Sequence, residues 1–296
     1  MSLDLPELQW ADLDGPLAYR TWDGPDATTF VLVHGLGASQ LVWTQVAPGL
    51  AGHGRVLALD LPGFGRSPRA SRPGGLMDHR RLLGRFLHEV AGGRVVLCGS
   101  SMGGGLSILQ AAIEPDTVRA LILTGSMFPP ARARLPHPAV AAAFGLYAIP
   151  GIGETLMEQR LRRLSPDRSV AIGFLVTTAD PRVIPREVIR LHEDQLREAQ
   201  HDPEIVSAFL EAARSVVRLA RRPDVARRAL DRVACPVLVL HGRRDRLIPI
   251  AYAEAEVARH PTWHARVFPD LGHLPMMEAP GRWLSAVADF LASYEL

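Results

Sequence analysis

The chain has 296 residues, of which 47% are hydrophobic and 22% charged, and its formal net charge is +2. Mean hydropathy lies near zero (+0.07), which excludes disordered and low-complexity classes. No run of 18 purely apolar residues is present, so we expect a soluble globular protein without an integral membrane segment. The acidic start of the chain lacks the basic residues of a secretory leader and predicts a cytoplasmic location.

All 33 basic residues are arginines, and 31 acidic residues are interspersed with them. A nucleic-acid-binding protein would gather such charge on one face beside a recognition motif, which this sequence lacks. Cys98 and Cys235 adjoin expected strands and are predicted to be buried thiols. Neither a His/Cys cluster with zinc-like spacing nor a complete dinucleotide-binding glycine motif occurs. We therefore expect no nucleic-acid partner, metal or cofactor, and a monomer or homodimer.

Short β-branched runs alternate with helical patterns through the first part of the chain. Expected strands occupy residues 17–22, 28–33, 55–60, 94–98 and 119–124. The inner runs are continuously apolar, as parallel strands covered on both faces require. An amphipathic helix is predicted between the expected strands 55–60 and 94–98, where five apolar residues recur at helical spacing: Leu82, Leu83, Phe86, Leu87 and Val90. The alternation predicts an α/β fold with a mostly parallel, doubly wound central sheet.

From about residue 127 to residue 232 this alternation stops, and only proline-punctuated helical patterns remain. Strands resume at 236–241 and 264–268, and a last helix carries Trp283, Val287 and Phe290 on one stripe. We therefore predict a core domain formed by residues 1–127 and 233–296. A helical cap, residues 128–232, is predicted to interrupt it.

The pattern G-x-S-x-G occupies residues 99–103, directly after the expected strand 94–98 and before a helical pattern. It places Ser101 on a sharp turn where larger flanking side chains would collide. The start of the following helix supplies backbone N–H groups and a partial positive charge to an oxyanion formed there. Ser101 is therefore the candidate nucleophile, whereas Ser100 does not fit the spacing. By itself the motif also suits a glycine-rich turn without any catalytic role.

A serine hydroxyl needs a base that removes its proton, and the base needs a third group that fixes its tautomer. Two later loops at strand ends offer both groups. Asp245 follows the expected strand 236–241, and His273 follows the expected strand 264–268. The chain order Ser101, Asp245, His273 is one of the orders in which such triads occur.

Four motifs together resemble the α/β-hydrolase superfamily, in the branch that carries a helical cap after the sixth strand. They are HGLG at 34–37, DLPGFGRS at 60–67, the turn around Ser101, and the loops with Asp245 and His273. The motifs span nearly the whole chain outside the expected cap. Their joint occurrence in this order is far more specific than any one of them.

The resemblance implies the chemical role of each site residue. Ser101 corresponds to the nucleophile, His273 to the general base and acid, and Asp245 to its orienting partner. The resemblance also implies an oxyanion hole made by the backbone N–H groups of Leu36 and Met102.

Other titratable side chains compete for these roles. Asp270 precedes His273 by three residues and is an alternative third member, although the family position favours Asp245. Three further side chains at strand ends are expected to support loops or pack rather than react: His34, Asp60 and His241. Two more are expected to be solvated in the cap: His192 and His201.

The nucleophile limits the reaction, since capped relatives that open epoxides or displace halide use Asp where this chain has Ser101. We expect cofactor-independent hydrolysis of a carboxylic ester of a small, fairly hydrophobic molecule, which the cap selects. The same residues allow hydrolysis of a C–C bond in a diketone-like metabolite, or of a lactone or thioester. A slow or non-catalytic ligand-binding receptor is the alternative from another class.

Overall fold

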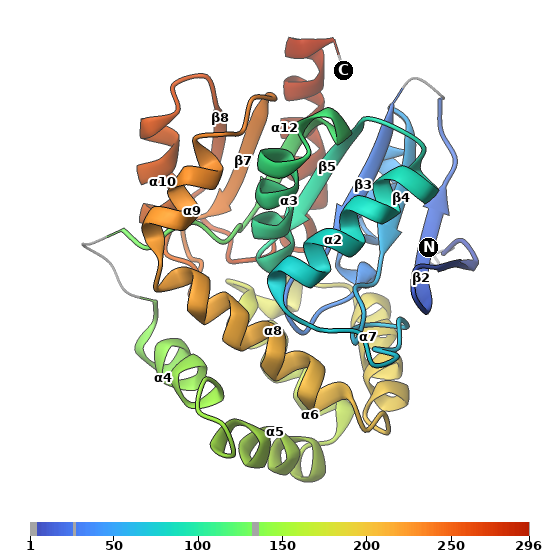
Figure 1. Ribbon diagram of the computed structural model, residues 1–296, viewed down its shortest axis with the longest axis vertical. Coiled ribbons are helices and arrows are strands. Elements are labelled where there is room, and N and C mark those ends of the chain that lie inside the picture. The colour runs from blue at the N-terminus through green and yellow to red at the C-terminus, as the bar shows by residue number, and fades with distance from the viewer. Residues whose placement is uncertain (1–4, 26–27, 132–135, 296) are drawn as a thin grey trace.

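The computed structural model describes residues 5–25, 28–131 and 136–295, and its centre is an eight-stranded sheet (Figure 1). The strands are β1 Leu8–Asp12, β2 Pro16–Trp22, β3 Thr29–Val33, β4 Arg55–Leu59, β5 Val95–Ser100, β6 Val118–Thr124, β7 Val237–Gly242 and β8 His264–Phe268. Their order across the sheet is β1-β2-β4-β3-β5-β6-β7-β8. The pairs β1–β2 and β2–β4 are antiparallel, and the remaining pairs are parallel. The predicted α/β class and mostly parallel sheet are confirmed.

Alternate residues of the inner strands enter two separate apolar clusters. In β3, Val31 and Val33 join one cluster while Phe30 and Leu32 join the other, and all four are fully buried. The first face is covered by α2 Leu76–Phe86 with its π-helical extension Leu87–Ala91, α3 Met102–Ile113, α9 Pro223–Leu230 and α10 Ile250–Arg259. The second face is covered by α1 Ala47–Leu50, α11 Pro275–Glu278 and α12 Pro280–Tyr294. The doubly wound arrangement follows from this two-sided burial.

The sequence analysis places seven of these strands to within two residues but does not place β1. This strand is the edge of the sheet, none of its residues is buried, and Trp10 is 52% exposed. Since only continuous or alternating burial produces a strand signal, an exposed edge strand carries little of it. Both cysteines are free thiols; Cys98 is buried, as predicted, whereas Cys235 is half-buried.

The chain between β6 and β7 is helical, and most of its helices lie below the sheet in Figure 1. They are α4 Pro138–Tyr147, α5 Ile152–Arg163, α6 Pro166–Thr177, α7 Arg186–Ala199 and α8 Ile205–Ala220, followed by α9. α9 packs on α3, and its Leu230 joins the first apolar cluster. Across the described ranges, no single helix has the length and apolar composition of a membrane span. α4 and α5 meet that test only as a pair bent by 111°.

Candidate active site

Ser101 lies between β5 and α3 in a conformation that non-glycine residues rarely adopt (φ +54°, ψ −118°). The turn brings the helix very close to the sheet. A Cβ on Gly103 would lie 2.3 Å from the carbonyl oxygen of Val33, and a Cβ on Gly99 would lie 2.5 Å from that of Gly103. Larger residues at either position would push α3 away from β5. The geometry is that of a strained strand-to-helix elbow, with Ser101 half-buried at the carboxyl edge of the sheet.

Asp245 and His273 form a hydrogen-bonded pair across two loops. His273 Nδ1 donates to Asp245 Oδ2 at 2.7 Å. The other carboxylate oxygen accepts the backbone N–H groups of Leu247 (2.8 Å) and Ile248 (2.9 Å), which fixes the orientation of the carboxylate. Because Nδ1 carries the donated proton, the lone pair of the neutral ring resides on Nε2, as a general base requires.

The ionisation of Asp245 is set by opposing effects. Burial by itself would raise the pKa of this carboxyl, but the charge on His273 and hydrogen bonds from His241 and His273 outweigh it and hold the pKa well below its ordinary value. His241 Nε2 lies 3.2 Å from Asp245 Oδ2 and 3.0 Å from the carbonyl oxygen of Ile248. The carboxylate is therefore ionised at neutral pH, and His241 is packed beside it as a second neighbour.

The alternative acid, Asp270, is paired with an arginine and not with His273. It forms a two-point ion pair with Arg282, at 2.7 and 3.0 Å, and its side chain is half exposed. Within the described ranges it makes no hydrogen bond to His273. The geometry thus favours Asp245 over Asp270 as the partner of the ring.

Ser101 and His273 both approach the carboxyl end of β6. The Ser101 N–H donates to the carbonyl oxygen of Thr124 at 3.1 Å, and a Cβ on the next residue, Gly125, would lie 3.0 Å from His273 Nδ1. For the part of the chain described, the Ser101 hydroxyl makes no hydrogen bond to the His273 ring. Such catalytic hydrogen bonds are often long before substrate binds. The structure therefore gathers all three predicted side chains at one edge, with two of them directly joined.

The loop at residues 35–37 crosses over Ser101. A Cβ on Gly35 would lie 2.9 Å from Ser101 Cβ and 3.5 Å from Ser101 Oγ. Among the described residues, no acceptor is hydrogen-bonded to the backbone N–H of Leu36 or Met102. The two N–H donors without a described acceptor therefore belong to this loop and to the start of α3, the two segments that adjoin Ser101.

His34 and Asp60 hold this loop in place rather than join the acid–base pair. The Leu61 N–H donates to His34 Nε2 at 2.9 Å, so the ring proton is on Nδ1. Nδ1 then donates to the carbonyl oxygen of Gly35 at 2.8 Å. The Asp60 carboxylate accepts the backbone N–H groups of Gln40 (2.7 Å) and Arg66 (2.9 Å). Burial lowers the pKa of His34 and raises that of Asp60. Both residues serve the framework, as the sequence predicts.

Helix α8 lies against the same loop. A Cβ on Gly37 would lie 3.0 Å from the ring of Phe209. Phe209 meets Tyr147 edge-on with centroids 5.6 Å apart, and Tyr147 meets Phe144 at 6.4 Å. An aromatic series therefore runs from the loop at residues 35–37 to α4.

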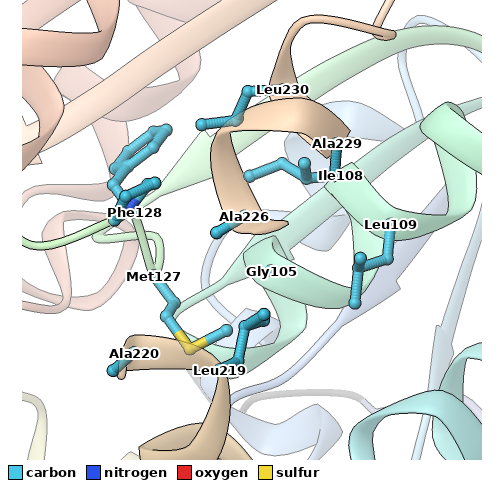
Figure 2. A pocket seen from close by; sticks show the side chains of 11 residues that line it. Gly105, Ile108, Leu109, Met127, Phe128, Leu219, Ala220, Ala226, Ala229 and Leu230 are labelled. Atoms are coloured by element: carbon cyan, nitrogen blue, oxygen red, sulfur yellow. The ribbon is translucent and has the colours of Figure 1, made fainter. Parts of the chain in front are cut away.

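Figure 2 shows a separate apolar pocket between α3, α8, α9 and the segment after β6. Its free space is about 20 Å³, room for about one water molecule. Met127 and Phe128 line it, but its described lining includes none of Ser101, Asp245 and His273. We interpret it as a packing gap behind the elbow rather than as the place where substrate binds.

The structure corrects one expectation about the helical segment. His192 is not a solvated side chain: its Nδ1 lies 2.9 Å from the carbonyl oxygen of Val188, and its ring meets Phe174 edge-on at 5.2 Å. His201 lies exposed next to Gln200. In the ranges that the structure covers, no three His, Cys, Asp or Glu side chains are grouped to hold a metal ion.

Two contacts in the candidate site are not specified by the sequence. Gly125 leaves the space that the His273 ring occupies, and Phe209 contacts the loop at residues 35–37, a contact that its helical spacing does not specify. A glycine directly after a buried strand is the one signal that points to the first. Nothing in the local sequence points to the second, because its contact joins segments 172 positions apart.

Comparison with known proteins identifies the family of the chain. A sequence profile of the alpha/beta hydrolase family matches residues 30–287. The chain is 29% identical to the dihydrolipoyllysine-residue acetyltransferase component of the acetoin cleaving system of Pseudomonas putida over 93% of its own length. It spans 66%, just under two thirds, of that relative.

Two further relatives are similar in length to this chain. A 2-hydroxy-6-oxononadienedioate/2-hydroxy-6-oxononatrienedioate hydrolase of Cupriavidus pinatubonensis is 27% identical, with 91% of this chain and 89% of the relative covered. The pimeloyl-(acyl-carrier protein) methyl ester esterase of Nitrosomonas europaea is also 27% identical, with 90% and 95% covered.

The fold is also similar to that of the crystal structure of Cfl2 from Burkholderia cenocepacia. The TM-score is 0.79 at 23% identity, over 97% of this chain and 96% of that one. The family match at residues 30–287 takes in β3 to β8, the elbow, and the loops with Asp245 and His273. This chain therefore belongs to the alpha/beta hydrolase family.

Proposed function

We propose that the protein is a cofactor-independent serine hydrolase that cleaves a carboxylic ester of a small, fairly hydrophobic molecule through an acyl-enzyme on Ser101. The observation that carries this proposal is the 2.7 Å bond between His273 Nδ1 and Asp245 Oδ2, at the strand ends where Ser101 occupies a strained elbow. A pair held in this tautomer activates a neighbouring hydroxyl. The Nitrosomonas europaea relative, an ester hydrolase by name, supports the same bond class.

In the first step, Ser101 Oγ attacks the ester carbonyl carbon while His273 Nε2 takes the hydroxyl proton. The carbonyl oxygen becomes an oxyanion and accepts hydrogen bonds from the Leu36 and Met102 N–H groups, which have no other described partner. Ionised Asp245 stabilises the imidazolium that results. No group outside the chain is needed for this step.

In the second step, the C–O bond to the alcohol breaks, and the alcohol oxygen takes the proton from His273. Water then attacks the acyl carbon and gives a proton to Nε2. The bond to Ser101 Oγ breaks, the oxygen regains its proton, and the carboxylic acid is released.

We assign residues 128–232 to a lid over this site and residues 1–127 and 233–296 to the catalytic domain. The contact between Phe209 and Gly37 supports this assignment, since it sets an aromatic ring next to the loop at residues 35–37, the proposed oxyanion loop. Such a ring favours an apolar acyl or alkyl group in the substrate. α9 is the point where the assigned lid joins the catalytic domain, because it packs on α3.

Hydrolysis of a C–C bond in a diketone-like metabolite is a second candidate. It is supported by the name of the Cupriavidus pinatubonensis relative and by the fact that the same three residues can serve it. The aromatic side chains beside the loop at residues 35–37 suit an apolar group in either kind of substrate. Lactones and thioesters are hydrolysed by the same steps and belong in the substrate panel.

The test compares p-nitrophenyl esters of increasing chain length, a lactone, a thioester and a vinylogous diketone. We expect turnover of a short or medium ester and a loss on the order of 10⁶ in kcat in Ser101→Ala, with an unchanged circular dichroism spectrum. Faster turnover of the diketone would favour the second candidate. Tight binding without turnover or a burst would favour a ligand-binding receptor, and full activity of the variant would overturn the proposal.

A further inference from the structure

The carboxyl end of α6 is hydrogen-bonded to both loops of the acid–base pair. Arg246, next to Asp245, donates from Nη1 to the carbonyl oxygen of Leu175 at 2.7 Å. The backbone N–H of His273 donates to the carbonyl oxygen of Thr177, also at 2.7 Å. The last carbonyl groups of a helix have no partner inside the helix, and here the two loops occupy them. The helical segment and the acid–base pair thus share one hydrogen-bonded frame.

Glu278, the last residue of α11, makes a second connection between these parts. Its Oε1 accepts the N–H of Gly272 at 2.8 Å, and its Oε2 accepts the N–H of Ala179 at 2.7 Å. The side chain is only 8% exposed. One buried carboxylate therefore bridges the loop of His273 and the segment that follows α6, through two charge-assisted bonds.

These contacts restrain the two consecutive N–H groups that precede the His273 ring. Gly272 is held by Glu278, His273 is held by Thr177, and the ring itself is held by Asp245. The space around Gly272 is tight, because a Cβ there would lie 2.6 Å from the backbone nitrogen of Ala179. With the bridge removed, the ring keeps its bond to Asp245 but loses one restraint on its position.

We propose that Glu278 is a positioning residue, which sets the distance of the His273 ring from Ser101 by locking the His273 loop to the end of α6. This inference rests on the proposed function. It also means that the end of α6 belongs to the same frame as the acid–base pair. A displacement of about 1 Å at a reacting group costs on the order of 10²-fold in rate.

The test uses Glu278→Gln in the full chain. The amide oxygen of the variant can accept from only one of the two backbone N–H groups, those of Gly272 and Ala179. The amide N–H₂ is itself a donor and cannot bond to the other. The matched control is Asp270→Asn. It also neutralises a carboxylate near the His273 loop, but this carboxylate accepts from the side chain of Arg282 and not from backbone N–H groups. Active sites are counted by end-point titration with a fluorophosphonate, and kcat and KM are measured for p-nitrophenyl butyrate.

We expect Glu278→Gln to lose 10- to 100-fold in kcat per titrated site, with KM changed less than about threefold, and to react more slowly with the fluorophosphonate. Asp270→Asn keeps all three values. A purely structural role would lower the number of titrated sites and the melting temperature but leave kcat per site at the wild-type value, and that result would overturn the inference. A wild type that neither labels nor turns over would instead contradict the proposed function.

Glu278→Asp keeps the test decisive where the amide variant fails to fold. It retains the charge but shortens the side chain, so the carboxylate no longer spans both N–H groups. We expect a loss in kcat per site that is smaller than that predicted for the amide, again at nearly constant KM. Wild-type kcat per site in this variant would overturn the inference.

Discussion

The Asp245 carboxylate divides its two oxygens between two tasks: Oδ1 accepts two backbone N–H groups of its own loop, and Oδ2 accepts the Nδ1 proton of His273. The acid is therefore immobilised before it holds the ring. Replacement by Asn preserves the size of the side chain, but its N–H₂ group can meet Nδ1 only if the ring adopts the other tautomer.

We predict that Asp245→Asn lowers kcat by about 10⁴, because a proton on Nε2 prevents the ring from accepting one from Ser101. Steady-state turnover of an activated ester measures the loss, and circular dichroism shows that the fold persists. Asp270→Asn is the control and keeps wild-type kcat. The reverse ranking of the two variants would identify Asp270 as the third member.

Phe209→Ala tests the role of α8 in substrate choice. Loss of the ring removes the contact with Gly37 and opens space beside the oxyanion loop. We expect kcat/KM for a short ester to fall about tenfold and the ratio of long-chain to short-chain activity to rise. Leu156→Ala, on the exposed part of α5, is the control. An unchanged chain-length profile would remove Phe209 from the substrate site.

Gly103→Ala tests the close approach behind the elbow. The new Cβ would lie 2.3 Å from the carbonyl oxygen of Val33, so we predict destabilisation by about 3 kcal/mol, measured by urea unfolding. Gly145→Ala is the matched control, since nothing lies within 4 Å of its Cβ position in α4. There the same substitution should stabilise by about 0.5–1 kcal/mol. Equal effects at the two sites would contradict the packing described here.

His79 makes stability depend on pH. Burial, with the charges of His34, Arg72 and Arg69, lowers the pKa of His79 to about 4. Between about pH 6.5 and pH 4 the unfolded chain binds a proton that the folded chain does not, so stability is complete above pH 6.5 and falls as pH decreases, by about 3 kcal/mol in total.

Urea unfolding at pH 7.5, 6 and 5 checks this prediction in wild type and His79→Leu. The variant should lose less stability over this range than the wild type. Some slope will remain, because burial also lowers the pKa of His34 and His192. An identical slope in both proteins would show that His79 does not titrate in this way.

The sequence points to those parts of the candidate site that depend on strand ends and tight turns. Ser101 becomes a candidate because glycines at 99 and 103 are needed where α3 crosses β5. Asp245 and His273 become candidates because loops after parallel strands meet at one edge. The exposed edge strand β1 lacks the apolar pattern that marks the inner strands.

Contacts between backbone groups distant in sequence are not predictable in this way. Glu278 bonds to two N–H groups, and every non-proline residue carries such a group, so no side-chain pattern identifies its partners. The contact of Phe209 with Gly37 depends likewise on how α8 lies over the sheet edge. Periodicity assigns residues to a helix face but does not specify which segment that face meets.

The central claim, that Ser101 is the nucleophile activated by His273, is tested most directly by mass spectrometry of the fluorophosphonate-labelled protein. Trypsin releases residues 95–119 as one peptide, which contains Ser100, Ser101 and Ser107. We predict one adduct per chain, located on Ser101, absent from Ser101→Ala and strongly slowed in His273→Ala. An adduct on another residue, or labelling of Ser101→Ala at the wild-type rate, would contradict the account.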